Sequence, residues 1–91
     1  MSHPPMKERK YFDVLADYLR ARLLRQASKG GKRKPCLSVR LSVATRGDEY
    51  KARVVEFGLG TSDEDMAAYG AALLVRGLRA AGVRVASKLP E

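Results

Sequence analysis

The chain has 91 residues, a formal net charge of +8 and a single cysteine, Cys36. These values fit one small basic domain and exclude a disulfide within the chain, which favours a reducing, cytoplasmic setting. No apolar stretch approaches the roughly 20 residues of a membrane span, and the first ten residues lack a hydrophobic signal region, so we expect no membrane association.

Amide side chains are nearly absent. The chain has no asparagine and one glutamine, Gln26, whereas charged residues make up 31% of it. Such a composition is typical of heat-adapted proteins, although a GC-rich genome would produce part of the same bias. We expect a thermophile protein.

The first element that the pattern predicts is a helix over residues 7–27, ended by Gly30-Gly31. Residues 1–6 contain the helix-opposing "HPP" and are expected to form a flexible tail ahead of a single domain over residues 7–91. The apolar side of the helix follows a spacing of three to four residues: Phe12, Leu15, Leu19, Leu23 and Gln26.

The stretch "SKGGKRK" at 28–34 has four cationic residues and two glycines. It fits a basic loop that clamps phosphates at the edge of a sheet, and equally a solvated linker. The cationic residues of this loop are Lys29, Lys32, Arg33 and Lys34.

Residues 36–44 alternate between apolar and polar, which predicts a strand. A turn that includes Gly47 follows, and residues 49–58 read as the returning strand of a hairpin. A two- or four-residue loop would place Leu37, Val39, Leu41 and Val43 on one face with Tyr50, Ala52 and Val54. The opposite face would then hold Cys36, Ser38, Arg40 and Ser42 with Lys51, Arg53, Val55 and Phe57.

A second helix follows, with Thr61 or Ser62 as its N-cap and Gly82 just after its end. Residues 83–88 read as a short strand with Arg84 outward. The expected core-facing stripe of the helix is Met66, Tyr69, Gly70, Leu73, Leu74, Gly77, Leu78 and Ala81.

These elements predict an α+β fold in the order α-β-β-α-β. We expect a small, largely antiparallel sheet with two helices packed on one face and an open basic face. That open face would present Arg40, Lys51, Arg53 and Arg84 around Phe57. Cations neutralise phosphates and an aromatic ring stacks on a base, which suits single-stranded nucleic acid. Phe57 fits a dimer interface equally well, whereas the four tyrosines are expected in the core or at its rim.

Catalysis is not expected. Cys36 has no histidine partner for a nucleophilic pair, and no spaced carboxylate pair stands out. "FGLGTS" holds a G-x-G before a helix, but the acids Asp63, Glu64 and Asp65 would repel phosphate, which favours a capped turn. We therefore predict no cofactor, no metal and no small-molecule substrate.

The hairpin "CLSVRLSVATRGDEYKARVVEF", with a helix before it and an Ala/Leu-rich helix after it, resembles the archaeal ThermoDBP-related group of small single-stranded nucleic-acid-binding proteins. The resemblance covers most of the chain. It implies a sheet flanked by helices, a basic and partly apolar cleft, self-association as a homodimer, and binding of single-stranded DNA or RNA by Arg40, Lys51, Arg53 and Phe57.

The leading hypothesis from the sequence is a non-enzymatic, sequence-tolerant binder of single-stranded DNA or RNA. The alternative is a protein–protein interaction subunit of a larger ribonucleoprotein or regulatory complex. A chromatin-type binder of duplexes is a third and more distant reading.

Overall fold

A computed structural model of the chain describes residues 6–26, 35–45 and 47–85. The described elements confirm an α+β fold, with one more strand than the sequence predicted. In chain order they are α1 (Met6–Arg20), β1 (Leu24–Arg25), β2 (Leu37–Thr45), the 3₁₀ turn η1 (Glu49–Lys51), β3 (Arg53–Gly58), α2 (Glu64–Ala80) and β4 (Val83–Val85).

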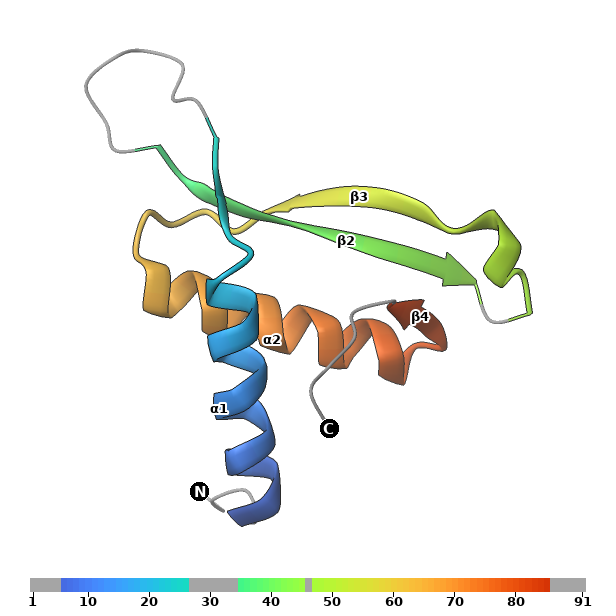
Figure 1. Cartoon of the computed structure of the whole chain (residues 1–91), viewed down its shortest axis with the longest axis horizontal. Coiled ribbons are helices and arrows are strands. Elements are labelled where there is room, and N and C mark those ends of the chain that lie inside the picture. Colours follow the sequence, from blue (N-terminus) through green and yellow to red (C-terminus); the bar gives the residue numbers. More distant parts are fainter. Residues whose placement is uncertain (1–5, 27–34, 46, 86–91) are drawn as a thin grey trace.

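Strand β2 is the centre of a four-stranded antiparallel sheet. It pairs with β3 along one edge, and with β1 and then β4 along the other edge. Both helices lie on the same side of the sheet: α2 runs beneath the hairpin, and α1 crosses α2 steeply and extends away from the strands (Figure 1). The core lies where the two helices meet the inner face of the sheet.

The first helix is shorter than the sequence predicted. It ends at Arg20, and residues 24–25 form a strand that pairs with Leu37 and Ser38. The pairing continues with a hydrogen bond of 2.9 Å from the Gln26 amide to the Cys36 carbonyl. Good helix formers over residues 21–26 are thus overridden by pairing with β2, a tertiary contact that helix propensity does not report.

The register of the hairpin differs from the expected one. Val39 opposes Phe57 and Leu41 opposes Val55, so these four side chains share one face. Seven residues, 46–52, connect β2 to β3, and η1 takes up part of that connection. The sequence suggested a loop of two or four residues. A connection with an odd number of residues turns each side chain of the returning strand to the face opposite the one expected for such a loop.

The predicted basic face is therefore wrong, because its residues do not all lie on one face of the sheet. Phe57 turns inward and packs against the core cluster that includes Leu15, Val39 and Ala71. Arg40 opposes Glu56 on the outer face. The outer face carries Ser38, Arg40, Ser42 and Ala44 from β2, Val54, Glu56 and Gly58 from β3, and Arg84 from β4.

Helix α2 contacts the rest of the fold through small residues. Its buried residues are Ala67, Ala68, Ala71, Ala72 and Val75. Met66, Tyr69 and Leu73, which the sequence placed in the core, are exposed. Alanines let the helix approach the sheet and α1 closely. Leu74 and Leu78, which the sequence also placed in the core, are partly buried and pack against it.

The ends of α2 are fixed by local signals. The N-cap is Asp63, not Thr61 or Ser62, because its carboxylate accepts a hydrogen bond of 3.0 Å from the Met66 amide. Thr61 supports this cap, since its hydroxyl accepts from the Asp63 amide at 3.1 Å. Gly82 follows the helix with φ +86°, which confirms the predicted terminating glycine.

The register can be tested by paired truncations. Replacing the inward Phe57 with alanine should lower the free energy of unfolding by about 2–4 kcal/mol, because a partly buried ring leaves a cavity. Val54→Ala, on the outer face where Val54 is 67% exposed, should cost less than about 1 kcal/mol. Urea unfolding followed by circular dichroism measures both, and a larger loss for Val54→Ala would reverse the two faces of β3.

The cap gives a second prediction. Asp63→Ala should lower the free energy of unfolding by about 1 kcal/mol, since it removes the acceptor for the Met66 amide. Ser62→Ala is the matched control and should change it by less than about 0.5 kcal/mol. If Ser62→Ala proved the costlier of the two in chemical denaturation, the cap assignment would be incorrect.

Candidate nucleic-acid interface

Residues of β2, β3, β4 and the turn between β2 and β3 line a cleft. In Figure 1 the hairpin extends past the end of α2 in this region. The volume of the cleft is about 490 Å³, within the range of ordinary ligand pockets. Three valines from three strands, Val43, Val55 and Val83, supply its apolar surface, and Lys51 and Arg53 supply cations. The remaining lining residues are Ala44, Thr45 and Asp48.

An exposed aromatic ring stands beside one of these cations, Lys51. Tyr50 is 80% exposed, and the Lys51 ammonium lies 5.7 Å from the centre of its ring. Among the described side chains, no carboxylate lies within ion-pair distance of Lys51 or Arg53. The cleft therefore combines two cations and one acidic residue, Asp48, with three valines, and the exposed Tyr50 ring lies next to Lys51. Cations beside an exposed ring and apolar side chains suit an anion that carries a flat hydrophobic group.

The backbone of the connection holds Tyr50 away from the core. Gly47 has φ +98°, a conformation that glycine adopts readily, as the sequence predicted for this turn. The Asp48 amide then donates to the Thr45 carbonyl at 2.8 Å, and the Lys51 amide donates to the Asp48 carbonyl at 2.9 Å. These short-range bonds form η1, so the ring is presented on a hydrogen-bonded turn.

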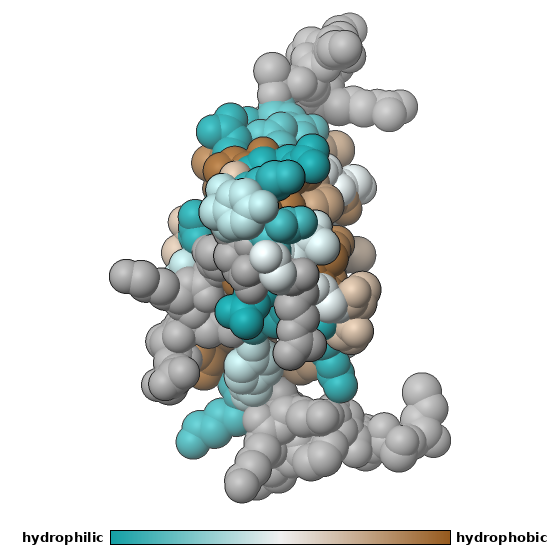
Figure 2. Space-filling model, turned by 90° about the vertical axis from the view of Figure 1, so that its right-hand side faces the viewer, coloured by the Kyte–Doolittle hydropathy of each residue, from teal (hydrophilic) through white to brown (hydrophobic). Residues whose placement is uncertain are grey.

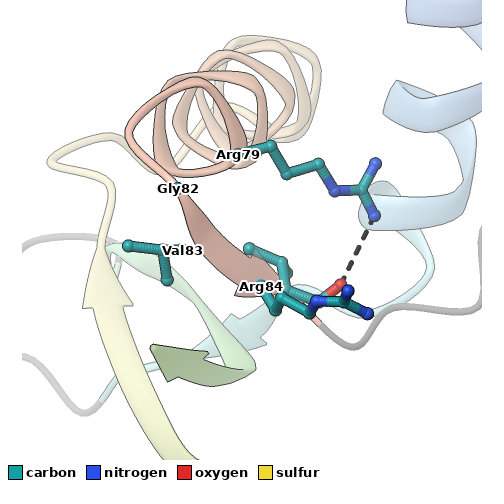
Figure 3. Close-up of a pocket in the computed structure, with 5 residues that line it drawn as sticks. Arg79, Gly82, Val83 and Arg84 are labelled. Carbon is teal, nitrogen blue, oxygen red and sulfur yellow. Dashed lines mark hydrogen bonds between the residues drawn. The ribbon is translucent and has the colours of Figure 1, made fainter. Parts of the chain in front are cut away.

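A second basic pocket, of about 340 Å³, adjoins the cleft through Val83. It is lined by Arg79 at the end of α2, by Gly82 and by β4, and Figure 3 shows the Arg79 and Arg84 side chains extending to the same side. Arg79 donates to the Val85 carbonyl at 3.4 Å and to the Tyr11 hydroxyl at 2.8 Å. Figure 2 looks onto this side of the molecule, where hydrophilic surface alternates with apolar patches.

The outer face of the sheet is less basic than the sequence predicted. Arg40 forms an ion pair of 3.0 Å with Glu56, and Gln26 donates to the same carboxylate at 3.2 Å. Arg84 lies on this side by register, but Arg53 and Phe57 lie on the opposite side. The structure thus brings Lys51 and Arg53 together and separates them from Arg40.

The acidic start of α2 is bound to the rest of the fold. Arg20 reaches Asp17 at 2.6 Å and Asp65 at 2.8 Å, and Arg25 reaches Glu64 at 3.5 Å. The hydrogen bond with Asp17, aided by the charge of Asp65, raises the pKa of Arg20 above its ordinary value, so it remains a cation. These pairs and the Asp63 cap fit the capped turn expected at "FGLGTS".

Two basic or aromatic residues of this region were not among the sequence candidates. Tyr50 was expected in the core or at its rim, although its position in a polar, charged turn was a usable signal. Arg79 was not selected, although the predicted strand that directly follows Gly82 already placed the end of this helix close to Arg84. The predicted loop residues Lys29, Lys32, Arg33 and Lys34 lie outside the described residues.

The described residues contain neither a metal-binding cluster nor a membrane-spanning helix. No group of three or more histidine, cysteine, aspartate or glutamate side chains is arranged to hold a metal ion. Neither described helix has the length and apolar character needed to cross a membrane.

Comparison with known proteins adds no assignment. No protein-family model matches the chain, and neither the curated proteins nor the solved structures include a significant match.

Proposed function

We propose that this protein is a non-enzymatic, sequence-tolerant binder of single-stranded nucleic acid, and that it binds at the cleft under the end of the hairpin. Lys51 and Arg53 neutralise phosphates, and Tyr50 stacks on a base. Binding gains free energy from released counterions and from stacking, neither of which depends on sequence.

The observation that carries this proposal is the exposure of Tyr50 beside Lys51, at a cleft that Lys51 and Arg53 both line. An aromatic ring that is 80% exposed gains little burial within the fold, and three valines supply the apolar surface of that cleft. The net charge of +8 favours a polyanionic ligand over a single small anion. Arg79 and Arg84 extend the basic surface around β4 and offer a continuation for the phosphate chain.

Single strands fit this geometry better than duplexes. A base can stack on a protruding side chain only if it is not already stacked and paired in a helix. Lys51 and Arg53 line a cleft formed by three strands, and neither lies on an α-helix that could enter a duplex groove.

An interaction subunit of a larger complex remains the second candidate. The exposed apolar side of α2, with Met66, Tyr69 and Leu73, favours it, because such residues on a small protein mark a contact surface. This candidate predicts that oligonucleotides are ignored at moderate salt.

The cationic part of the proposal is tested by the double variant Lys51→Gln/Arg53→Gln. Removing two phosphate contacts should weaken binding to a labelled single-stranded oligonucleotide and make the slope of log affinity against log salt shallower by about 1.4. Fluorescence anisotropy between roughly 50 and 200 mM salt measures both quantities.

The matched control is Arg25→Gln/Arg40→Gln, which removes the same charge from residues already paired with Glu64 and Glu56. It should retain the wild-type slope. If the two double variants lost affinity and salt dependence equally, only the net charge would matter, and the cleft would be excluded as the site.

The stacking part is tested at Tyr50. Tyr50→Ala should weaken binding to the single strand by about 1–3 kcal/mol, whereas Tyr50→Phe should bind as the wild type does. The same titration with the annealed duplex provides the reference, because its bases are not free to stack. Undiminished single-strand affinity in Tyr50→Ala would exclude the ring from the site.

A further inference from the structure

One residue of the cleft does not fit a site for phosphates alone. Asp48 lines the same cleft as Lys51 and Arg53, and it is half-buried there. A carboxylate repels phosphates and offsets one of the two cations. Asp48 therefore lowers the affinity of the cleft for any polyanion unless the ligand offers the carboxylate a compensating contact.

The carboxylate of Asp48 is not used by the turn that holds it. Backbone atoms fix this turn: the Asp48 amide donates to the Thr45 carbonyl at 2.8 Å, and the Asp48 carbonyl accepts from the Lys51 amide at 2.9 Å. In the part of the chain that the structure describes, no cation lies within ion-pair distance of this carboxylate and no donor is hydrogen-bonded to it. Its oxygens remain available to a ligand in the cleft.

The chemistry of a carboxylate restricts what that contact can be. An ionised carboxylate accepts hydrogen bonds and donates none. A nucleic-acid strand has donors on the amino and imino groups of its bases and, in RNA, on the 2′-hydroxyl of each ribose. The base donors differ between nucleotides, whereas the 2′-hydroxyl occurs at every one. A cleft that relies on phosphate charge and base stacking keeps its tolerance of sequence if Asp48 accepts from the sugar.

RNA and DNA would meet this carboxylate differently. An internal deoxynucleotide has no sugar hydroxyl, so with DNA the repulsion between Asp48 and the phosphates is uncompensated. With RNA the 2′-hydroxyl can donate to the carboxylate, and hydrogen bonds to a charged acceptor are stronger than those between neutral groups. One side chain thus disfavours one class of strand and favours the other.

We propose that Asp48 makes the cleft selective for RNA over DNA by accepting a hydrogen bond from a ribose 2′-hydroxyl. Lys51 and Arg53 bind phosphates, Tyr50 stacks on a base, and Asp48 binds the sugar that joins them. Each part of a ribonucleotide then meets a side chain of matching chemistry. This inference rests on the proposed function, because it assigns the class of single strand that the same cleft binds.

The first test compares strands that differ only in the sugar. Oligouridine and oligodeoxyuridine of equal length carry the same base, and only oligouridine has the 2′-hydroxyl. Fluorescence anisotropy with the full chain should show oligouridine bound about tenfold more tightly, and 2′-O-methyl-oligouridine, which lacks the donor, should lose this advantage. Equal affinity for oligouridine and oligodeoxyuridine, or full affinity for the 2′-O-methyl strand, would overturn the inference.

The second test changes Asp48 itself. Asp48→Ala removes the acceptor and the repulsion together, so it should weaken oligouridine binding about tenfold and strengthen oligodeoxyuridine binding. Loss of folding would weaken both, so opposite changes cannot arise from it. Asp13→Ala is the matched control: Asp13 is exposed on α1 and does not line the cleft, so its loss should leave the ratio of the two affinities unchanged. A wild-type ratio in Asp48→Ala would exclude the carboxylate as its cause.

This inference and the proposed function fail with different results. If both strands bind equally and Lys51→Gln/Arg53→Gln weakens both, the cleft binds single strands without selecting the sugar, and only the inference is excluded. If neither strand binds at roughly 50 mM salt, both are excluded. If oligocytidine and oligodeoxycytidine bind equally and more tightly than oligouridine, Asp48 accepts from a base donor, and the 2′-hydroxyl is excluded.

Discussion

The pairing of every other strand with β2 is the constraint on which the rest of the structure depends. Strands β1 and β4 have two and three residues, too few to persist without a partner. Both are held by β2, at opposite ends of the same edge. The position of β1 fixes where α1 must end, and β4, which directly follows Gly82, attaches the C-terminal end of α2 to the sheet. A single central strand thus sets the placement of both helices.

The alanine-rich inner side of α2 is central to the packing. It lets the helix lie close to the sheet and to α1, whose Leu15 and Leu19 complete the core. Three larger side chains of α2, Met66, Tyr69 and Leu73, lie outside this packing and meet solvent. Close packing inside and an apolar surface outside therefore arise from the same distribution of residue sizes along one helix.

Local signals predicted much of this fold. Alternation marked β2, periodicity marked both helices, and glycines marked the turn at Gly47 and the end of α2. Two failures depended on long-range contacts: residues 24–25 become a strand only because β2 lies beside them, and the inward face of β3 depends on the length of its connection. The N-cap of α2 and its outward residues Met66, Tyr69 and Leu73 were also predicted incorrectly. Of the cleft, Lys51 and Arg53 were predicted, but their grouping with Arg40 on one face followed from the wrong register. Tyr50 was missed because an aromatic in a turn was given an interior role.

The seven-residue connection between β2 and β3 also limits how this sequence can diverge. Adding or deleting one residue there, with the ladder otherwise kept, would turn every side chain of β3 to the opposite face. Glu56 would then point at the helices, and Phe57 would enter solvent. An insertion or deletion of two residues would preserve the faces. Homologous chains that keep this fold should therefore differ in this connection by even numbers of residues, or carry a compensating bulge in the strand.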